Sequence, residues 1–362
     1  MKRQNNYWFL PFFLCWTVAG QFIFSAEPFR LVENNKKKQL TFLEGTQPIL
    51  TYQYDAVEHE HVLPNDLRRT AGCYVHPLYG LNGEILTDNA PADHYHHHGV
   101  FWTWPHVGLH EPDGSVTEYD LWTSDTALKQ HFVCWVRKDV AEQTATMEVE
   151  NGWYVGDPAE GKKIMTERVW IIAHRVLQVG DVTSRAVDFE FRWQPLDKPI
   201  TLRGSEGKSY GGFSVRFKPF VLAGKNEAER SETNRITAPS GIAENDLPET
   251  PLAWADYTSH FPRDVTGEAI VTLDGKPVED AVTMFVPKDQ PSGASIFVPK
   301  SHPDFPPTWL TRYYGPLCVG WPGVKGRTFR PREVFFVRYR VWIHEGTVTV
   351  PQIEKAYQEY TH

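Results

Sequence analysis

The chain has 362 residues, and its 37 Lys and Arg residues against 45 Asp and Glu residues give a formal net charge of −8. An acidic chain repels phosphate backbones, which argues against a nucleic-acid partner. Only Cys73, Cys134 and Cys318 follow the first 26 residues. At most one disulfide bridge can therefore form, and the fold must rest on a hydrophobic core.

The first 26 residues have the pattern of an export signal. A basic start and an apolar run precede the small residues Ser25 and Ala26. An uncleaved anchor is the alternative, because Phe24 stands where a small residue is usual. No later stretch reaches the roughly 18 apolar residues that a membrane span requires. We therefore expect a mature protein, residues 27–362, that is periplasmic or extracellular and has no membrane span.

Most of the mature chain alternates apolar and polar residues with a period of two. It is rich in Val, Ile, Phe, Tyr and Thr, which predicts β-strands. Turn signals such as Asn-Gly, Pro-Asp-Gly and Asp-Gly separate the alternating segments. The predicted strands span residues 131–140, 144–155, 186–195, 211–220, 268–273, 293–299 and 333–346.

Only the C-terminal segment VPQIEKAYQEYTH has a clear helical period, with an apolar stripe formed by Ile353, Ala356, Tyr357 and Tyr360. Residues 223–251 are polar and predict a long surface loop rather than a domain linker. Many strands and few helices favour an all-β fold. We expect a large two-sheet antiparallel β-sandwich that forms one domain.

The segment ADHYHHHGVFWTWPHVGLHEPDG, residues 92–114, holds six histidines within 17 residues. Imidazole is both the commonest metal ligand and the commonest acid–base group near neutral pH. If residues 93–102 are extended, His94, His96 and His98 share one face, with neighbours about 6.6 Å apart. The next residues alternate as well, so Trp102 and Trp104 share one face.

Two neighbouring imidazoles at that spacing can hold one metal ion, but a third ligand must come from elsewhere in the chain. The candidate ligands of a divalent metal are His94, His96, His76 and His302. Three interpretations stay open: a metal site, a metal-free pocket lined by histidines, and a histidine-rich segment without a site.

The segment HPLYGLNGEILTDNAPADHYHHHGVFWTW resembles the core motif of a bacterial family, mostly exported and frequent in planctomycetes, that is labelled a domain of unknown function or the "methane oxygenase PmoA family". His98 and His302 depart from its motifs: an Arg is common at the first position, and a small polar or Asn-containing pattern is usual at the second. The resemblance spans about residues 40–347. Further matching segments follow in the same order: EGKSYGGFSVRF, PLAWADYTS, IFVPKSHPDFPPTWLTRYYGP and VFFVRYRVWIHEG.

The family's predicted architecture resembles the β-sandwich of aldose mutarotases and of several polysaccharide lyases and glycosidases. This resemblance implies a small sugar or oligosaccharide ligand in a cleft, although fold analogy does not confer function. The methane-oxidising subunit with the same short name is built from membrane-spanning helices, and this chain has no span after its signal. We therefore interpret the oxygenase label as a misnomer and keep a metal-dependent oxidoreductase as an alternative.

A mutarotase-like site needs a general acid and a general base on opposite sides of a sugar ring, and His and Glu are the usual pair. A noncatalytic glycan-binding protein would show aromatic platforms without such a pair. The resemblance implies that the candidate catalytic residues are His94, His97, His98, Glu206 and Lys208. It implies that the candidate substrate-binding residues are Trp102, Arg216, Asp256, Trp309, Arg312 and Tyr314.

Overall fold

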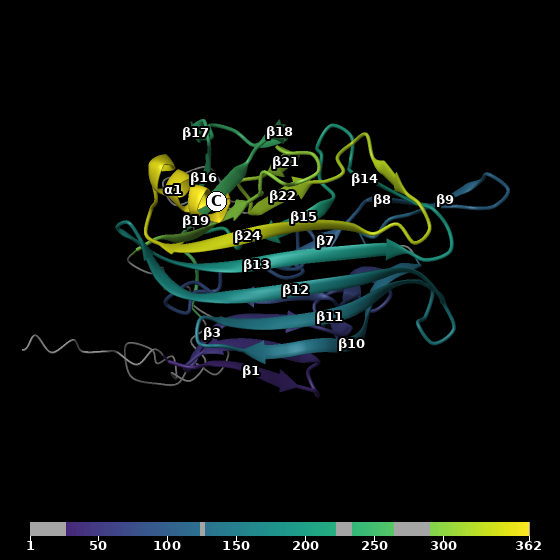
Figure 1. Cartoon of the computed structure of the whole chain (residues 1–362), viewed down its shortest axis with the longest axis horizontal. Coiled ribbons are helices and arrows are strands. Elements are labelled where there is room, and N and C mark those ends of the chain that lie inside the picture. The colour runs from purple at the N-terminus through teal and green to yellow at the C-terminus, as the bar shows by residue number, and fades with distance from the viewer. Residues whose placement is uncertain (1–26, 124–126, 222–233, 264–289, 362) are drawn as a thin grey trace, which may run out of the picture.

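The computed structural model describes residues 27–123, 127–221, 234–263 and 290–361. The predicted export signal and the predicted strand 268–273 lie outside these residues. The described chain is built from strands in two large sheets, with a helix near the C-terminus (Figure 1).

The first sheet consists of nine strands: β1 (Phe29–Asn34), β2 (Gln39–Glu44), β3 (Gln47–Gln53), β6 (Tyr74–Leu78), β7 (Val100–Thr103), β15 (Gly212–Arg216), β18 (Leu247–Pro251), β21 (Thr308–Thr311) and β22 (Pro316–Gly320). Their order in the sheet is β1-β2-β3-β6-β7-β15-β22-β21-β18, and all neighbours run antiparallel. Strand β7 is therefore central in this sheet.

The second sheet also has nine strands: β10 (Leu128–Val140), β11 (Thr144–Val155), β12 (Lys162–Val179), β13 (Val182–Pro195), β16 (Arg235–Ala238), β17 (Gly241–Ile242), β19 (Trp254–Ser259), β20 (Ser292–Phe297) and β24 (Phe335–Glu345). They follow the antiparallel order β10-β11-β12-β13-β24-β20-β19-β16-β17. Its long strands lie in front in Figure 1.

Two smaller sheets complete the described chain. One contains β8 (His106–His110), β9 (Val116–Tyr119), β14 (Ile200–Arg203) and β23 (Arg327–Phe329). The other pairs β4 (Val57–Glu58) with β5 (Thr70–Ala71), and the 3-10 helix η1 (Leu67–Arg69) lies between these two strands in the chain.

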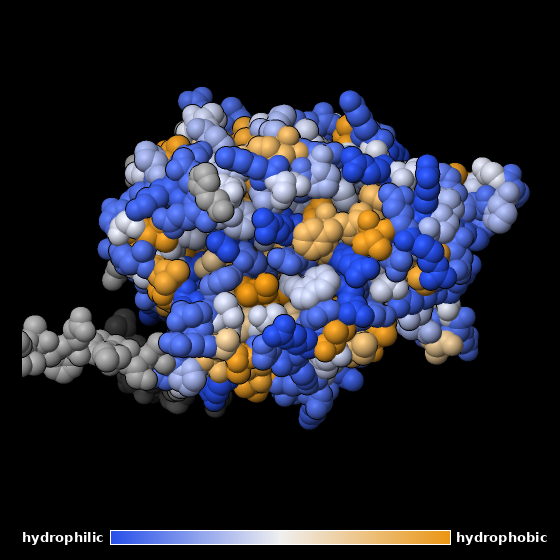
Figure 2. All heavy atoms as spheres, in the orientation of Figure 1, coloured by the Kyte–Doolittle hydropathy of each residue, from blue (hydrophilic) through white to orange (hydrophobic). Residues whose placement is uncertain are grey.

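Alternating burial along the strands places the core between the two large sheets. Trp102 of the first sheet packs on Phe191 of the second, with ring centroids 4.8 Å apart, and Phe213 packs on Tyr339 at the same separation. The opposite face of the second sheet, toward the viewer in Figure 2, is mainly hydrophilic with small separate apolar groups. The predicted all-β, two-sheet antiparallel sandwich is confirmed.

The C-terminal helix prediction is also confirmed, because α1 (Val350–Thr361) buries Ile353, Ala356 and Tyr357. These residues pack with Trp254 and Trp342 in a cluster separate from the main core. No helix in the described part of the chain is long and apolar enough to cross a membrane.

The prediction of a surface loop over residues 223–251 is wrong for residues 235–251, which contain β16, β17 and β18. Residues 223–233 of that prediction lie outside the described residues. The polar composition of this region concealed two buried apolar positions, Ile236 and Ala238. They let β16 pair with β19 at the end of the second sheet. Cys73, Cys134 and Cys318 are all free thiols.

Candidate functional site

The histidine segment forms two consecutive turns, so the assumption of an extended strand is wrong. The His94 N–H donates to the carbonyl of Pro91 at 2.9 Å, and the His97 N–H donates to the carbonyl of His94 at 3.0 Å. Strand β7 begins only at Val100. The turns bring residues three apart together, and the rings of His94 and His97 stack with centroids 4.6 Å apart.

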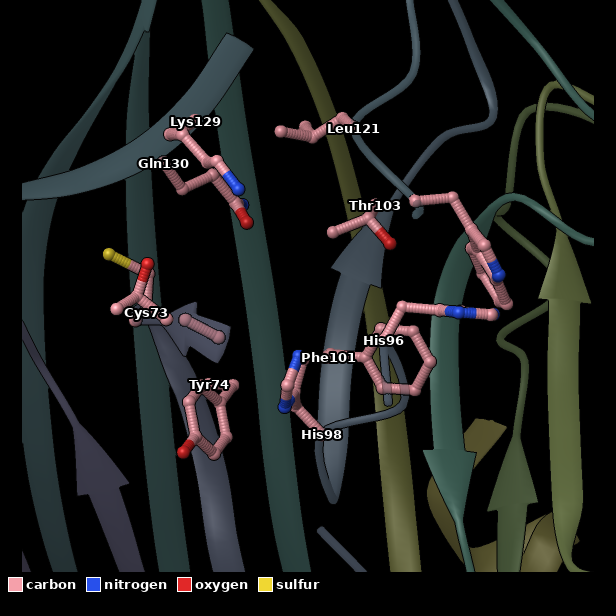
Figure 3. A pocket seen from close by; sticks show the side chains of 13 residues that line it. Cys73, Tyr74, His96, His98, Phe101, Thr103, Leu121, Lys129 and Gln130 are labelled. Atoms are coloured by element: carbon pink, nitrogen blue, oxygen red, sulfur yellow. The ribbon is translucent and has the colours of Figure 1, made fainter. Parts of the chain in front are cut away.

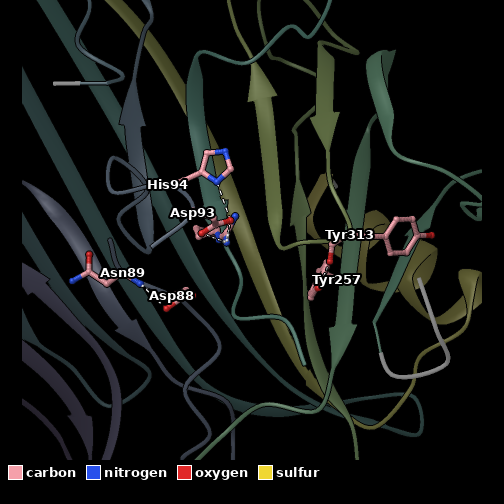
Figure 4. Close-up of polar contacts among 7 residues, drawn as sticks. Asp88, Asn89, Asp93, His94, Tyr257 and Tyr313 are labelled. Carbon is pink, nitrogen blue, oxygen red and sulfur yellow. Dashed lines mark hydrogen bonds and ion pairs between the residues drawn. The ribbon is translucent and has the colours of Figure 1, made fainter. Parts of the chain in front are cut away.

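Arg216, at the end of β15, anchors this segment through Asp93. Its Nη2 donates to both Asp93 oxygens, at 3.2 and 2.9 Å, and His94 Nδ1 lies 2.9 Å from Asp93 Oδ2. Figure 4 shows the contact between His94 and Asp93. Burial opposes ionisation of Asp93, but the bonds from His94 and Arg216 outweigh it and lower the pKa to about 2. The predicted ligand clamp is therefore occupied by a carboxylate of the protein itself.

Tyr314 extends the same arrangement. Its ring stacks on His94 at 5.1 Å, and the Arg216 guanidinium lies over the tyrosine ring at 4.8 Å from its centroid. The predicted sugar platform is thus a packing surface for His94. The Nε and Nη1 atoms of Arg216 are buried and have no hydrogen-bond partner among the described residues.

His98 lies just before β7, packs on Tyr74 with ring centroids 5.0 Å apart, and is 7% exposed. Its Nδ1 is 3.1 Å from Oδ1 of Asn89, and the Asn89 amide donates to the Tyr74 hydroxyl at 3.3 Å. The ring of His59 stacks on His98 at 5.2 Å. His98 Nε2 is buried and has no hydrogen-bond partner within the described ranges.

The bond to Asn89 fixes the tautomer of His98. Because Asn89 Oδ1 can only accept, the proton sits on Nδ1 and the lone pair sits on Nε2. Burial, with smaller contributions from neighbouring histidines, holds the pKa of His98 well below its ordinary value. His98 is therefore a neutral imidazole at neutral pH, with Nε2 as an acceptor.

A narrow pocket of about 30 Å³ opens beside His98. Figure 3 shows His96, His98 and Thr103 on one side and Lys129 and Gln130 facing them across the space. Thr103 Oγ1 is also buried without a hydrogen-bond partner in the described chain. The walls are completed by Thr70, Ala71, Gly72, Cys73, Tyr74, Phe101, Leu121 and Trp122.

Gly99 lets the histidine segment approach β6. Its φ is +60°, and a Cβ added there would lie 2.1 Å from the carbonyl oxygen of Val75. The Gly99 N–H donates to the Asp88 carbonyl at 2.8 Å, and its own carbonyl accepts from the Arg216 N–H at 2.7 Å. A glycine is therefore required at the point where three segments meet.

We expect Gly99→Ala to lower the melting temperature clearly more than Gly114→Ala does. Both positions have positive φ, but nothing lies within 4 Å of the Cβ position of Gly114. The conformational cost of about 1–2 kcal/mol is common to both variants, and only Gly99→Ala adds a clash with backbone. Calorimetry of both variants measures this difference, and equal melting temperatures would contradict the close approach.

Trp102 and Trp309, predicted as sugar platforms, are core residues. They are 1% and 0% exposed, and their indole N–H groups donate to Glu167 and to the carbonyl of Leu252. The predicted alternation in β7 is correct, but Phe101 and Thr103, on the opposite face, line the pocket. Asp256 is fully buried and is bonded to His344 at 2.9 Å.

The other predicted polar residues lie outside the pocket. Glu206 is 73% exposed and pairs with Arg203, and Lys208 is exposed in the same turn. Arg312 pairs with Asp246 at 2.9 Å. These side chains neither line the pocket nor contact His98.

The four candidate metal ligands do not gather. His94 and His96 have ring centroids 5.6 Å apart, but His76 is bonded to Thr87 and His302 to Tyr339. Among the described residues, no group of three His, Cys, Asp or Glu side chains is placed to hold a metal ion. The four candidate histidines therefore do not fit the metal site that their spacing in the sequence suggested.

Sequence reasoning missed Asn89, Lys129 and Gln130. Gln130 stands near the start of β10 in an ordinary strand pattern, and no motif marks it. Thr103 could have been predicted, because the alternation of β7 places it on the opposite face of the strand from Trp102.

The fold and site define an antiparallel β-sandwich with a pocket that is lined by His96 and His98 and by residues of both large sheets. The chain belongs to the family of unknown function DUF6807, whose model matches residues 39–358. No curated protein matches the chain. Among solved structures it is similar to a galactose 1-epimerase from Lactobacillus acidophilus NCFM, at 11% sequence identity, with a TM-score of 0.34 and coverage of 88% of this chain and 98% of that one.

Proposed function

We propose that the protein is exported and binds a carbohydrate at the mouth of the narrow pocket beside His98, where His98 acts as a general base in a proton transfer on the sugar. The observation that carries this proposal is the buried, neutral imidazole with Nδ1 committed to Asn89 and Nε2 unpartnered at the pocket. A base needs this lone pair within reach of the proton that it removes.

The remaining lining supports a sugar ligand. Phe101 and Trp122 pack with ring centroids 5.1 Å apart and supply apolar surface, while Thr103 and Gln130 supply polar atoms. Aromatic surface with a few placed polar groups is typical of small-molecule sites and suits the mixed character of a sugar ring. The Lys129 ammonium, across the pocket in Figure 3, is the proposed proton donor.

The sugar loses one proton and gains one proton in this reaction, so its charge does not change. His98 Nε2 takes a proton from a hydroxyl or from a carbon beside a carbonyl, and Lys129 gives a proton to an oxygen of the same molecule. Ring opening of a reducing sugar is the simplest reaction of this kind. An elimination or an epimerisation would use the same two residues.

We expect His98→Gln to lower turnover by about 10²-fold or more, the contribution typical of a general base. Polarimetry with D-galactose and D-glucose detects ring opening, and proton NMR in D₂O detects removal of carbon-bound protons. His110→Gln is the matched control, because His110, at the end of β8, is bonded to Thr201 of β14 and does not line the pocket.

The pH profile tests the same residue. Because the pKa of His98 is lowered, the base form persists as the pH falls, and the acid limb of the wild-type profile should lie below about pH 6.5. Sugar binding without turnover would show that the protein is a glycan-binding protein and not an enzyme. No binding of any sugar in a broad panel would contradict the proposal.

A further inference from the structure

The side-chain amide of Gln130 is fixed by hydrogen bonds to the buried carboxylate of Glu167 and to a backbone carbonyl. Its Nε2 donates to Oε2 of Glu167 at 3.0 Å and to the carbonyl of Trp102 at 3.3 Å. Both partners are acceptors, so this network settles which end of the amide carries the nitrogen. Both amide protons are used on the core side, and Oε1 is left for the pocket that Gln130 lines.

Glu167 is ionised, and this follows from its partners. It is fully buried and accepts five N–H donors, none of which can accept a proton in return. A protonated carboxyl would point its O–H at one of these donors. The donors are Trp102 Nε1, Asn151 Nδ2, Gln130 Nε2, Trp153 Nε1 and Trp193 Nε1.

A negative charge behind an amide makes its carbonyl oxygen a stronger acceptor, because hydrogen-bonded dipoles polarise one another in a low dielectric. Gln130 Oε1 therefore offers the pocket a fixed acceptor that cannot rotate into a donor without breaking two bonds. His98 Nε2 offers a second acceptor across the pocket.

We infer that Gln130 determines ligand specificity by accepting a hydrogen bond from one hydroxyl of the sugar, and that Glu167 is the residue that positions it. This inference rests on the proposed function and names the group that the ligand must present, a hydroxyl donor. Fluorine occupies the place of a hydroxyl but cannot donate. A deoxyfluoro sugar with fluorine at that position should therefore be rejected.

The test measures binding of D-galactose, D-glucose and their 2-, 3-, 4- and 6-deoxyfluoro derivatives by calorimetry. At one position, fluorine should weaken binding to the wild-type protein about tenfold or more. In Gln130→Leu, the parent sugar and that fluoro sugar should bind within about twofold of each other. Gln194→Leu, whose amide is bonded to the carbonyl of Arg332 at the surface, is the matched control.

The outcomes separate the two proposals. If no parent sugar binds the wild-type protein, the proposed function and this inference both fail. If a parent sugar binds and no hydroxyl-to-fluorine ratio depends on Gln130, only this inference is overturned. Should Gln130→Leu fail to fold, the Gln130 amide signals of the wild-type protein decide instead. They should shift when the parent sugar binds, and unshifted signals would overturn the inference.

Discussion

Glu167→Gln should lower the free energy of unfolding by about 2–6 kcal/mol, because each buried donor left unsatisfied costs about 1–3 kcal/mol and at least two would face the new NH₂ group. The three indole donors lie 2.8 to 3.0 Å from the carboxylate oxygens, with the Asn151 and Gln130 amides at 2.9 and 3.0 Å. Urea unfolding followed by circular dichroism measures the change.

Glu118→Gln is the control for this substitution. Glu118 is exposed in β9, and a surface change of this kind is usually within about 0.5 kcal/mol of neutral. If both variants unfolded at the same urea concentration, Glu167 would not be the buried anion that the five donors require.

Asp256→Asn should cost about 3–5 kcal/mol of stability, the range for breaking one partner of a buried ion pair. Asp256 and His344 are both fully buried. His344 Nδ1 lies 3.1 Å from the Gly346 carbonyl and its Nε2 lies 2.9 Å from Asp256 Oδ1. Both ring nitrogens face acceptors, so the ring is an imidazolium whenever Asp256 is ionised.

The pH dependence of this variant has a definite sign. Burial works against ionisation of Asp256, but His344 and the Thr258 and Ser295 hydroxyls outweigh it, so the pKa is lowered on folding. The stabilisation is present above the unfolded pKa of about 3.9 and is lost as the pH falls below it. Thermal unfolding from pH 7 to pH 3 should show a shallower acid slope for Asp256→Asn. Asp197→Asn, an exposed residue, should keep the wild-type slope.

The regular part of the fold was predictable because each strand carries its own signal. The segment TATMEVENGWYV coincides with β11, and the stripe of Ile353, Ala356 and Tyr357 marks the buried side of α1. The fold class follows from these local patterns. The order in which the strands pair does not follow from them. Strand β7 pairs with β15 across more than 100 residues, and no residue in either strand indicates which strand its partner is.

The site was only partly predictable for the same reason. The sequence predicts the histidine segment as the centre of the candidate site and includes His98 among the candidate residues. Its tautomer depends on Asn89, which reaches it only because residues 91–98 turn back on themselves. Glu167 did leave a signal, since it stands in phase with Met165, Val169 and Ile171 on the buried face of β12. An acid in an apolar phase indicates a buried carboxylate with partners from other strands.

The shared carboxylate gives the protein an optical reporter of its own. Three indoles and the Gln130 amide that lines the pocket donate to the same two oxygens. A ligand hydroxyl that donates a hydrogen bond to Gln130 would change the electric field at all three indoles. Indole emission responds to such a change in nearby charge. Occupation of the pocket can therefore be followed through intrinsic fluorescence, without a label and without knowing the reaction.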